Sequence, residues 1–358
     1  IIFKFIYILY LGTEILVILT PIILSILRNF KMIRSDWTIE EISNIYHKPL
    51  IELIQQANNV HNQFHKLGEV QICTLLSIKT GGCTEDCAYC SQAARYNTGL
   101  ETESLLSYDN VLEAANRAKN AGSTRFCMGA AWKEVRNNRD FDSVIEMIKG
   151  VNELGLEVCG TLGMATEEQI SKMKTAGLHA YNHNVDTSEE YYSDIISTHT
   201  HTDRLETLKN IRNAGVTICS GGIIGMGESD TDRVKMLYSL ATLEIHPESV
   251  PINALVSIDG TPLEDRPLVS TWEMVRMIAT ARIIMPKSMV RLSAGRLSMS
   301  QEAQALCFLA GANSIFSGEK LLTTPNPGVN EDQQLFELLG LTPRPSHKEE
   351  KSEDFCCS

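Results

Sequence analysis

Three cysteines fall within one short run of the 358-residue chain, Cys83-Thr84-Glu85-Asp86-Cys87-Ala88-Tyr89-Cys90. Four thiolates complete a cubane iron–sulfur cluster or a tetrahedral zinc site. This run supplies three thiolates from one loop, so one metal position is left open for a small molecule. The alternatives are a structural zinc knuckle with its fourth ligand elsewhere, or buried thiols. Zinc sites usually use paired Cys-x2-Cys hooks, so the spacing favours a reactive iron–sulfur cluster.

Three further cysteines, Cys127, Cys159 and Cys219, each lie in an apolar or glycine-rich run. A single cysteine of this kind is most often a small buried side chain. Three of them directed into one interior would make a second metal site, and Arg291 would complete a ring of four. A guanidinium stays protonated near neutral pH and is a poor metal ligand. The residues alone therefore assign Arg291 to an anion such as a sulfide or a carboxylate.

A polar run, Asn182-His183-Asn184-Val185-Asp186, lies at the end of a predicted strand. Side chains of a strand alternate between its two faces, so the two asparagines and the aspartate share one face. His183 and Val185 then point toward the helix layer. An unpaired buried polar group costs about 1–3 kcal/mol. We expect a polar ligand to pair with this trio, and an internal hydrogen-bond network is the alternative.

These residues must be positioned by a regular alternation of strands and helices, which begins near residue 70. Several of the predicted helices end at a glycine, as expected of a helix C-cap. The predicted strands are Cys73–Ser77, Thr124–Met128, Leu156–Thr161, Ala180–Val185, Thr217–Ser220, Val250–Val256, Met289–Ser293 and Ser314–Phe316. The predicted helices are Asp109–Ala121, Phe141–Leu154, Glu167–Ala176, Asp203–Ala214, Thr231–Leu243, Thr271–Met285 and Ser300–Ala310, after a helical lead at Thr38–Leu67.

Eight strand–helix units predict an α/β fold, a (β/α)8 TIM barrel with a helical N-terminal lead. A doubly wound open sheet is the alternative. A TIM barrel carries its functional residues at the C-terminal ends of its strands. The unusual residues fall at such ends: the three-cysteine loop follows the first strand, Asn253 lies on the sixth and Arg291 on the seventh.

Composition and charge restrict the class of protein. Hydrophobic content of 43% and charged content of 21% are those of a globular protein with a sizeable core. A net charge of −12 argues against a nucleic-acid partner. The clustered cysteines fit metal ligation in a reducing compartment, so we expect a cytoplasmic location.

The ends of the chain differ from the barrel. Residues 1–31 form an apolar extension that we expect to lie outside the functional protein. Residues 5–27 are long enough to span a bilayer, so a membrane tether or a targeting segment remain alternatives. The expected division is then a helical lead at 32–69, the barrel at 70–342 and a disordered tail at 343–358.

Two histidine pairs could suggest further metal sites. His61 and His65 lie on a predicted helix, and His199 and His201 lie in a predicted loop. We interpret both pairs as solvated side chains.

The three-cysteine loop resembles that of the radical S-adenosylmethionine superfamily, and longer runs resemble the biotin synthase family within it. The match covers roughly Trp37 to Pro343. Its most specific runs are Tyr181-Asn182-His183-Asn184, Cys219-Ser220-Gly221-Gly222 and Arg291-Leu292-Ser293-Ala294-Gly295-Arg296.

The resemblance implies radical insertion of sulfur into dethiobiotin, which yields biotin and makes the chain a sulfurtransferase. Cys83, Cys87 and Cys90 would hold a [4Fe–4S] cluster that binds S-adenosylmethionine and cleaves it to a 5′-deoxyadenosyl radical. A [2Fe–2S] cluster would donate the sulfur. Its ligands would be Cys127, Cys159, Cys219 and Arg291, which conflicts with the assignment of Arg291 from the residues alone.

The resemblance also implies contacts and partners. Asn184 and Asp186 match positions at the ribose of S-adenosylmethionine, with Tyr89 near the adenine and Ile223 in the cofactor wall. Asn182, Asn184 and Asn253 match the amides around the ureido ring of dethiobiotin, which presents both donors and an acceptor. A flavodoxin or ferredoxin is the expected reductant, and a homodimer the expected assembly.

Three other functions remain as alternatives. One is a radical S-adenosylmethionine barrel that acts on another small molecule. A second is a non-catalytic iron–sulfur or zinc protein, which a closed four-thiolate site would favour. The third, a cysteine hydrolase, is the weakest, because no cysteine has a recognisable histidine partner.

Overall fold

The computed structural model describes residues 33–318 and 320–346. From Ser35 onward they belong to one compact unit. The apolar extension at 1–31 and most of the C-terminal tail lie outside the described residues, so the expectations about them stay predictions. Among the described residues, no helix is long and apolar enough to cross a membrane.

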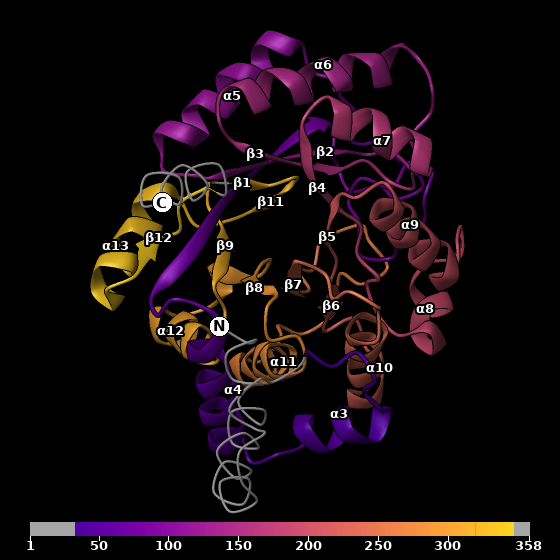
Figure 1. Ribbon diagram of the computed structural model, residues 1–358. Helices are drawn as coiled ribbons and strands as arrows, with labels where there is room; N and C mark the ends of the chain where they lie inside the picture. The colour runs from indigo at the N-terminus through magenta and orange to yellow at the C-terminus, as the bar shows by residue number, and fades with distance from the viewer. Residues whose placement is uncertain (1–32, 319, 347–358) are drawn as a thin grey trace, which may run out of the picture. The chain divides into compact units, whose positions relative to one another are not determined.

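Eight parallel strands close into a barrel, which confirms the predicted (β/α)8 fold and excludes the open sheet (Figure 1). The last barrel strand, β9, pairs with β1 through Gln71–Ser314, Ile72–Ile315 and Cys73–Phe316, and this pairing closes the ring. In their order around the barrel the strands are β1 Glu69–Lys79, β2 Arg125–Ala130, β3 Glu157–Thr161, β4 Leu178–Asn182, β5 Thr217–Cys219, β7 Ser249–Ala254, β8 Met289–Leu292 and β9 Ser314–Phe316.

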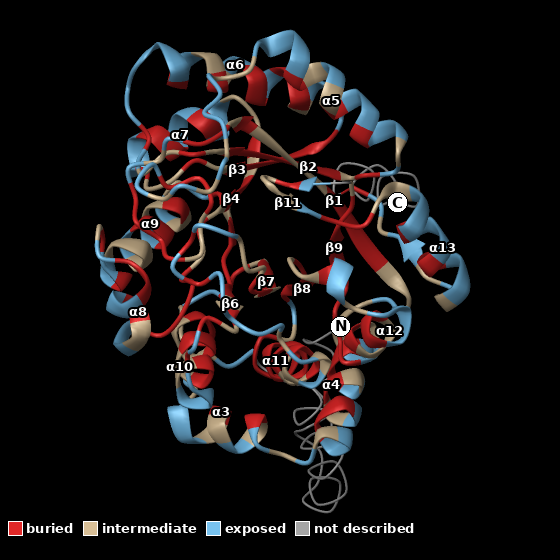
Figure 2. Cartoon of the chain, turned by 180° about the vertical axis from the view of Figure 1, so that it is seen from behind, coloured by how far each residue is buried: buried red, intermediate tan, exposed pale blue. Residues whose placement is uncertain are grey.

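Helices surround the barrel and turn their buried faces toward it (Figure 2). Serine, threonine and asparagine N-caps begin them; Thr166 and Gln169, for example, form a reciprocal capping box. Glycines with positive φ follow α5, α6 and α7 at Gly122, Gly155 and Gly177, as predicted. The helices are α5 Tyr108–Asn120, α6 Arg139–Glu153, α7 Glu167–Thr175, α8 Glu189–Ile195, α9 His201–Asn213, α10 Asp230–Ala241, α11 Thr271–Ile284 and α12 Gln301–Leu309.

The helical lead consists of two helices, α3 Ile39–Tyr46 and α4 Leu50–Phe64, with Pro49 between them. Proline is favoured at a helix start and disfavoured in a helix interior, so it divides the lead. Helix α4 packs on α11, and α3 packs on α10 and α11. The lead is therefore part of the outer helical layer.

Several short elements of the structure were not predicted from the sequence. They are α8, α13 Val329–Leu339, β6 Gly222–Ile224, the hairpin β10 Lys320–Leu321 and β11 Thr324–Pro325, and β12 Thr342–Pro343. Strand β12 pairs with β1, and the Arg344 N–H donates to the Val70 carbonyl over 2.9 Å. The tail expected to be disordered from Pro343 thus begins in a strand, because the N-terminal end of β1 supplies partners that local composition cannot reveal.

Candidate active site

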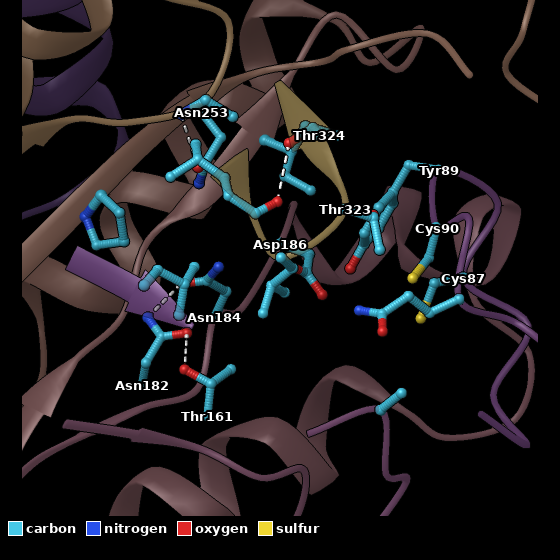
Figure 3. A pocket seen from close by; sticks show the side chains of 18 of the residues that line it. Cys87, Tyr89, Cys90, Thr161, Asn182, Asn184, Asp186, Asn253, Thr323 and Thr324 are labelled. Carbon is cyan, nitrogen blue, oxygen red and sulfur yellow. Dashed lines mark hydrogen bonds between the residues drawn. The ribbon is translucent and has the colours of Figure 1, made fainter. Parts of the chain in front are cut away.

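A cavity of about 330 Å³ lies at the C-terminal ends of the barrel strands (Figure 3). It brings together almost all of the predicted site residues. Cys83, Cys87, Tyr89, Cys90, Cys127, Cys159, Asn182, Asn184, Asp186, Ile223, Asn253 and Arg291 line it, whereas Cys219 is buried beside it.

The loop that carries the three predicted cluster cysteines is held in place by hydrogen bonds from the protein itself. The N–H of Cys83 donates to the Gln92 carbonyl over 2.9 Å, and the Cys83 carbonyl accepts from Ala94 over 2.8 Å. Asp86, inside the loop, accepts from the backbone N–H groups of Ser197 and Thr198. Burial alone would raise the pKa of Asp86, but hydrogen bonds from the hydroxyl and backbone N–H groups of Ser197 and Thr198 lower it to about 2. The loop is therefore anchored by an ionised carboxylate.

Glu85, the neighbouring loop residue, belongs to a buried polar chain. Its carboxylate lies 2.7 Å from His199 Nδ1, and His199 Nε2 lies 2.8 Å from the Tyr192 hydroxyl. The Tyr192 hydroxyl in turn accepts from Arg204 Nε over 2.9 Å. This series of hydrogen bonds links the cysteine loop to α8 and α9.

The interpretation of the histidine pairs as solvated was wrong. His199, His201 and His61 are buried, and His65 is partly buried with Nε2 at 3.0 Å from the Pro286 carbonyl. His199 contacts Glu85 and His65 contacts the Pro286 carbonyl, and both partners are distant in sequence, so local patterns gave no sign of these contacts. Within the described part of the chain, no three histidine, cysteine or acidic side chains form a site for a single metal ion. A cluster binds its cysteines through different irons, so its thiols need not meet at one point.

Strand β4 ends at Asn182, earlier than predicted, and this changes where the polar run points. The alternation of faces stops there, and His183 lines the cavity instead of facing the helices. Asp186 takes a left-handed conformation with φ of 63°, and its backbone carbonyl accepts from Ile223 N–H over 2.8 Å. Its carboxylate forms a buried ion pair with Arg204, at 3.2 Å. Asp186 therefore faces the cavity with its charge already compensated.

The asparagines are connected to one another, as the alternative of an internal network requires. Asn182 Nδ2 lies 3.3 Å from Asn184 Oδ1, which also accepts from Gly221 N–H over 3.2 Å. On β7, Asn253 Nδ2 donates to the Gly222 carbonyl over 3.0 Å. Each amide has two donors and two lone pairs, so these contacts leave capacity for a polar ligand.

The second group of cysteines lies deeper in the barrel. Cys127 and Cys159 occupy paired positions on β2 and β3, and Cys219 lies at the end of β5. The Arg291 guanidinium donates from Nη1 to Cys219 Sγ over 3.6 Å and from Nε to Ser314 Oγ over 2.9 Å. Burial would lower the pKa of Arg291, but the surrounding thiols raise it above its usual range. Arg291 is thus a buried cation among thiols.

A fourth buried thiol in this group, Cys73 on β1, was missed. Arg291 Nη2 lies 3.3 Å from its Sγ. Burial would raise the pKa of Cys73, but a hydrogen bond with Cys127 and the charge of Arg291 lower it to about 6. Its signal in the sequence was the same as that of Cys127: a lone cysteine in a predicted strand.

Comparison with known proteins identifies the family. A model of the radical SAM superfamily matches residues 77–240, and a model of the biotin and thiamin synthesis associated domain matches residues 251–342. Biotin synthase from Cytophaga hutchinsonii is 65% identical over 88% of this chain and 94% of its own length. The chain belongs to the biotin synthase family. The mitochondrial biotin synthase of Arabidopsis thaliana is 57% identical over 90% of this chain and 86% of its own length.

Solved structures support the family's barrel fold. Methylornithine synthase superposes with a TM-score of 0.74 at 18% identity, over 88% of this chain and 96% of its own. The hydrogenase maturase HydG from Carboxydothermus hydrogenoformans gives 0.73 at 16% identity, over 91% and 79%. As a radical S-adenosylmethionine sulfurtransferase family, biotin synthases require S-adenosylmethionine and iron–sulfur clusters, and the thiol-lined cavity fits that requirement.

Proposed function

We propose that the chain converts dethiobiotin to biotin and that its two groups of cysteines hold two different clusters. Cys83, Cys87 and Cys90 would hold a [4Fe–4S] cluster, and Cys127, Cys159, Cys219 and Arg291 a [2Fe–2S] cluster. One observation carries this proposal: cysteines of both groups line one cavity at the C-terminal ends of the barrel strands. Sulfur insertion needs both groups to reach the same substrate.

When bound, the first cluster supplies the electron that cleaves S-adenosylmethionine, and the second supplies sulfide. The loop geometry supports a three-thiolate set, because hydrogen bonds to Asp86 hold the loop in place. Tyr89, Asn184, Asp186 and Ile223 would bind S-adenosylmethionine, since all four line the cavity. Tyr89 and Ile223 pack in one cluster with Cys87 and Cys90, and Figure 3 shows Tyr89 beside Cys90.

Asn182, Asn184 and Asn253 would bind the ureido ring of dethiobiotin. Their amides come from one side of the barrel: from β4, from the segment after it, and from β7, which only β5 separates from β4. A ureido ring presents N–H donors and a carbonyl acceptor, which the free capacity of these amides matches. The mostly apolar wall would keep water away from a substrate radical.

The proposed role of Arg291 as an iron ligand conflicts with the hydrogen bonds that it makes. Ligation of iron would require its guanidine to give up a proton, whereas the buried cation here donates to thiols. We keep Arg291 in the ligand set because the resemblance implies it. A flavodoxin or ferredoxin as reductant, a homodimer and a cytoplasmic location complete the proposal.

The test is an anaerobic reaction of the reconstituted full chain with S-adenosylmethionine, dithionite and dethiobiotin, followed by mass spectrometry. Biotin and 5′-deoxyadenosine together support the proposal, and 5′-deoxyadenosine without biotin points to another substrate. The Cys159→Ala variant should make no biotin yet still cleave some S-adenosylmethionine. Loss of the [4Fe–4S] spectrum in that variant would contradict the division of the two sites.

A further inference from the structure

His199, in the connection between α8 and α9, is a buried histidine to which the proposed function gives no role. It lines the cavity together with Glu85 and Arg204. Both of its ring nitrogens have partners: Nδ1 lies 2.7 Å from a carboxylate oxygen of Glu85, and Nε2 lies 2.8 Å from the Tyr192 hydroxyl. A side chain held at both ring nitrogens has a fixed orientation, so we asked what its two contacts hold in place.

The direction of these hydrogen bonds follows from Arg204, which can only donate. Its Nε donates to the Tyr192 hydroxyl oxygen over 2.9 Å. The hydroxyl proton of Tyr192 is then directed to Nε2 of His199, which accepts it. A neutral ring with its proton on Nδ1 satisfies both contacts of His199, because Nδ1 then donates to Glu85. Every donor in the series thus has an acceptor.

Arg204 connects the series to the proposed S-adenosylmethionine site. Its Nη2 lies 3.2 Å from the carboxylate of Asp186, the residue proposed at the ribose. A guanidinium is planar and rigid, so the contact of Nε with the Tyr192 hydroxyl fixes the direction in which Nη2 meets Asp186. The place of the Tyr192 hydroxyl therefore decides where the Asp186 carboxylate is held.

The two contacts of His199 are not equally replaceable. On the loop side, the Thr198 hydroxyl donates to the same oxygen of Glu85, and Lys133 Nζ lies 3.7 Å from the other oxygen. The loop would keep these contacts without His199. On the other side, Nε2 of His199 is the acceptor for the Tyr192 proton among the hydrogen bonds of the described residues. Without it, a buried hydroxyl proton would be unpaired, which is costly enough to move the side chain.

We infer that His199 is a positioning residue for S-adenosylmethionine. It orients the Tyr192 hydroxyl, which orients Arg204 and, through Arg204, the Asp186 carboxylate. His199 itself need not touch the cofactor. This inference rests on the proposed function, because only there is Asp186 assigned to the ribose of S-adenosylmethionine.

Two substitutions of His199 separate its two contacts. The side-chain amide of an asparagine lies near the Nδ1 position of a histidine, and that of a glutamine lies near the Nε2 position. His199→Asn therefore keeps the contact with Glu85 and loses the one with Tyr192, whereas His199→Gln does the reverse. Tyr192→Phe removes the hydroxyl and keeps the ring. His201→Asn is the matched control: its ring packs edge-on against Tyr192 at 5.5 Å, but its nitrogens have no hydrogen-bond partner among the described residues.

The test measures binding, not turnover. The full chain is reconstituted with iron and sulfide and kept oxidised, so that S-adenosylmethionine binds without being cleaved. Its Kd is measured anaerobically by titration calorimetry, while circular dichroism and iron content check folding and cluster assembly. We expect His199→Asn and Tyr192→Phe each to raise the Kd about tenfold, the scale of one buried hydrogen bond to a charged group. His199→Gln and His201→Asn should bind like the wild type.

Equal affinities of His199→Asn and His199→Gln, whether both tight or both weak, would overturn the inference, because it assigns the effect to the Tyr192 contact. Adding Tyr192→Phe to His199→Asn should weaken binding no further, since both remove the same contact, and an additive loss would also contradict it. If His199→Asn does not fold, Tyr192→Phe and His199→Gln make the same comparison. A wild-type chain that assembles its clusters but binds no S-adenosylmethionine would overturn the proposed function, and the inference with it.

Discussion

The side-chain amide of Asn182 donates a hydrogen bond to the Sγ of Cys219 over 3.2 Å. It also contacts the Cys219 carbonyl at 3.3 Å, so β4 and β5 are joined at the level of the cavity floor. A residue proposed to bind the substrate is thereby fixed to a residue proposed to hold the sulfur donor. The contact would orient the substrate relative to the cluster.

Asn182→Ala should therefore impair both the binding of dethiobiotin and the environment of the second cluster. Loss of a hydrogen-bonding partner next to a metal ligand typically costs about 10–100-fold in affinity or activity. We expect biotin formation to fall by that factor, with a raised KM for dethiobiotin and an altered spectrum of the second cluster. Asn116→Ala, on the exposed face of α5, is the control. A wild-type KM and spectrum in Asn182→Ala would remove this residue from the site.

Cys87→Ala should lose the first cluster and keep the second, whereas Cys159→Ala should lose the second and keep the first. Cys87 lies in the anchored loop, apart from the deep group, so its loss should abolish the [4Fe–4S] spectrum and cleavage of S-adenosylmethionine. The second cluster should still assemble. Cys307→Ala, outside the cavity, should keep both cleavage of S-adenosylmethionine and formation of biotin. Full cleavage of S-adenosylmethionine by Cys87→Ala would refute the role of the loop.

Gly221→Ala should destabilise the turn that leads from β5 to β6. A Cβ at this position would lie 1.9 Å from the Pro251 carbonyl oxygen, so the backbone of β7 would have to move. Overpacking of this kind costs about 1–3 kcal/mol, and we expect a Tm lowered by several degrees. At Gly328 a Cβ meets nothing within 4 Å, so Gly328→Ala is the matched control. Identical Tm values for the two variants would show that the turn adjusts freely.

The His61 and His65 pair should make stability depend on pH. Burial, followed by the positive charge of Arg282, lowers the pKa of His61 to about 4 and of His65 to about 3. Below the unfolded pKa of about 6.5 the unfolded chain binds protons that the folded chain does not. The contribution of the two histidines to the free energy of unfolding is therefore fully present above that pH and falls as the pH drops toward 4.

The slope is at most about 1.4 kcal/mol per pH unit for each histidine. His61→Asn/His65→Asn should show a shallower fall of Tm between pH 7.5 and pH 5.5, measured anaerobically by circular dichroism. The same fall in the wild type and in the variant would assign the pH dependence to other groups.

The sequence predicted the barrel well because strand–helix alternation, helix caps and terminal glycines are local signals. It failed where long-range contacts decide the structure. Buried His199 contacts Glu85, which lies 114 residues earlier in the sequence. Pro343 belongs to a strand because it pairs with Val70. Cys73 was passed over because its contacts with Cys127 and Arg291 come from packing inside the closed barrel.

In the proposed function, the deep cysteine group holds the cluster whose sulfide becomes the sulfur of biotin. A single anaerobic turnover of the full chain reconstituted with heavy-isotope sulfide, with ordinary sulfur elsewhere in the reaction, tests this origin. The biotin formed should carry the heavy isotope, and Cys159→Ala should form none. Biotin containing ordinary sulfur would contradict it.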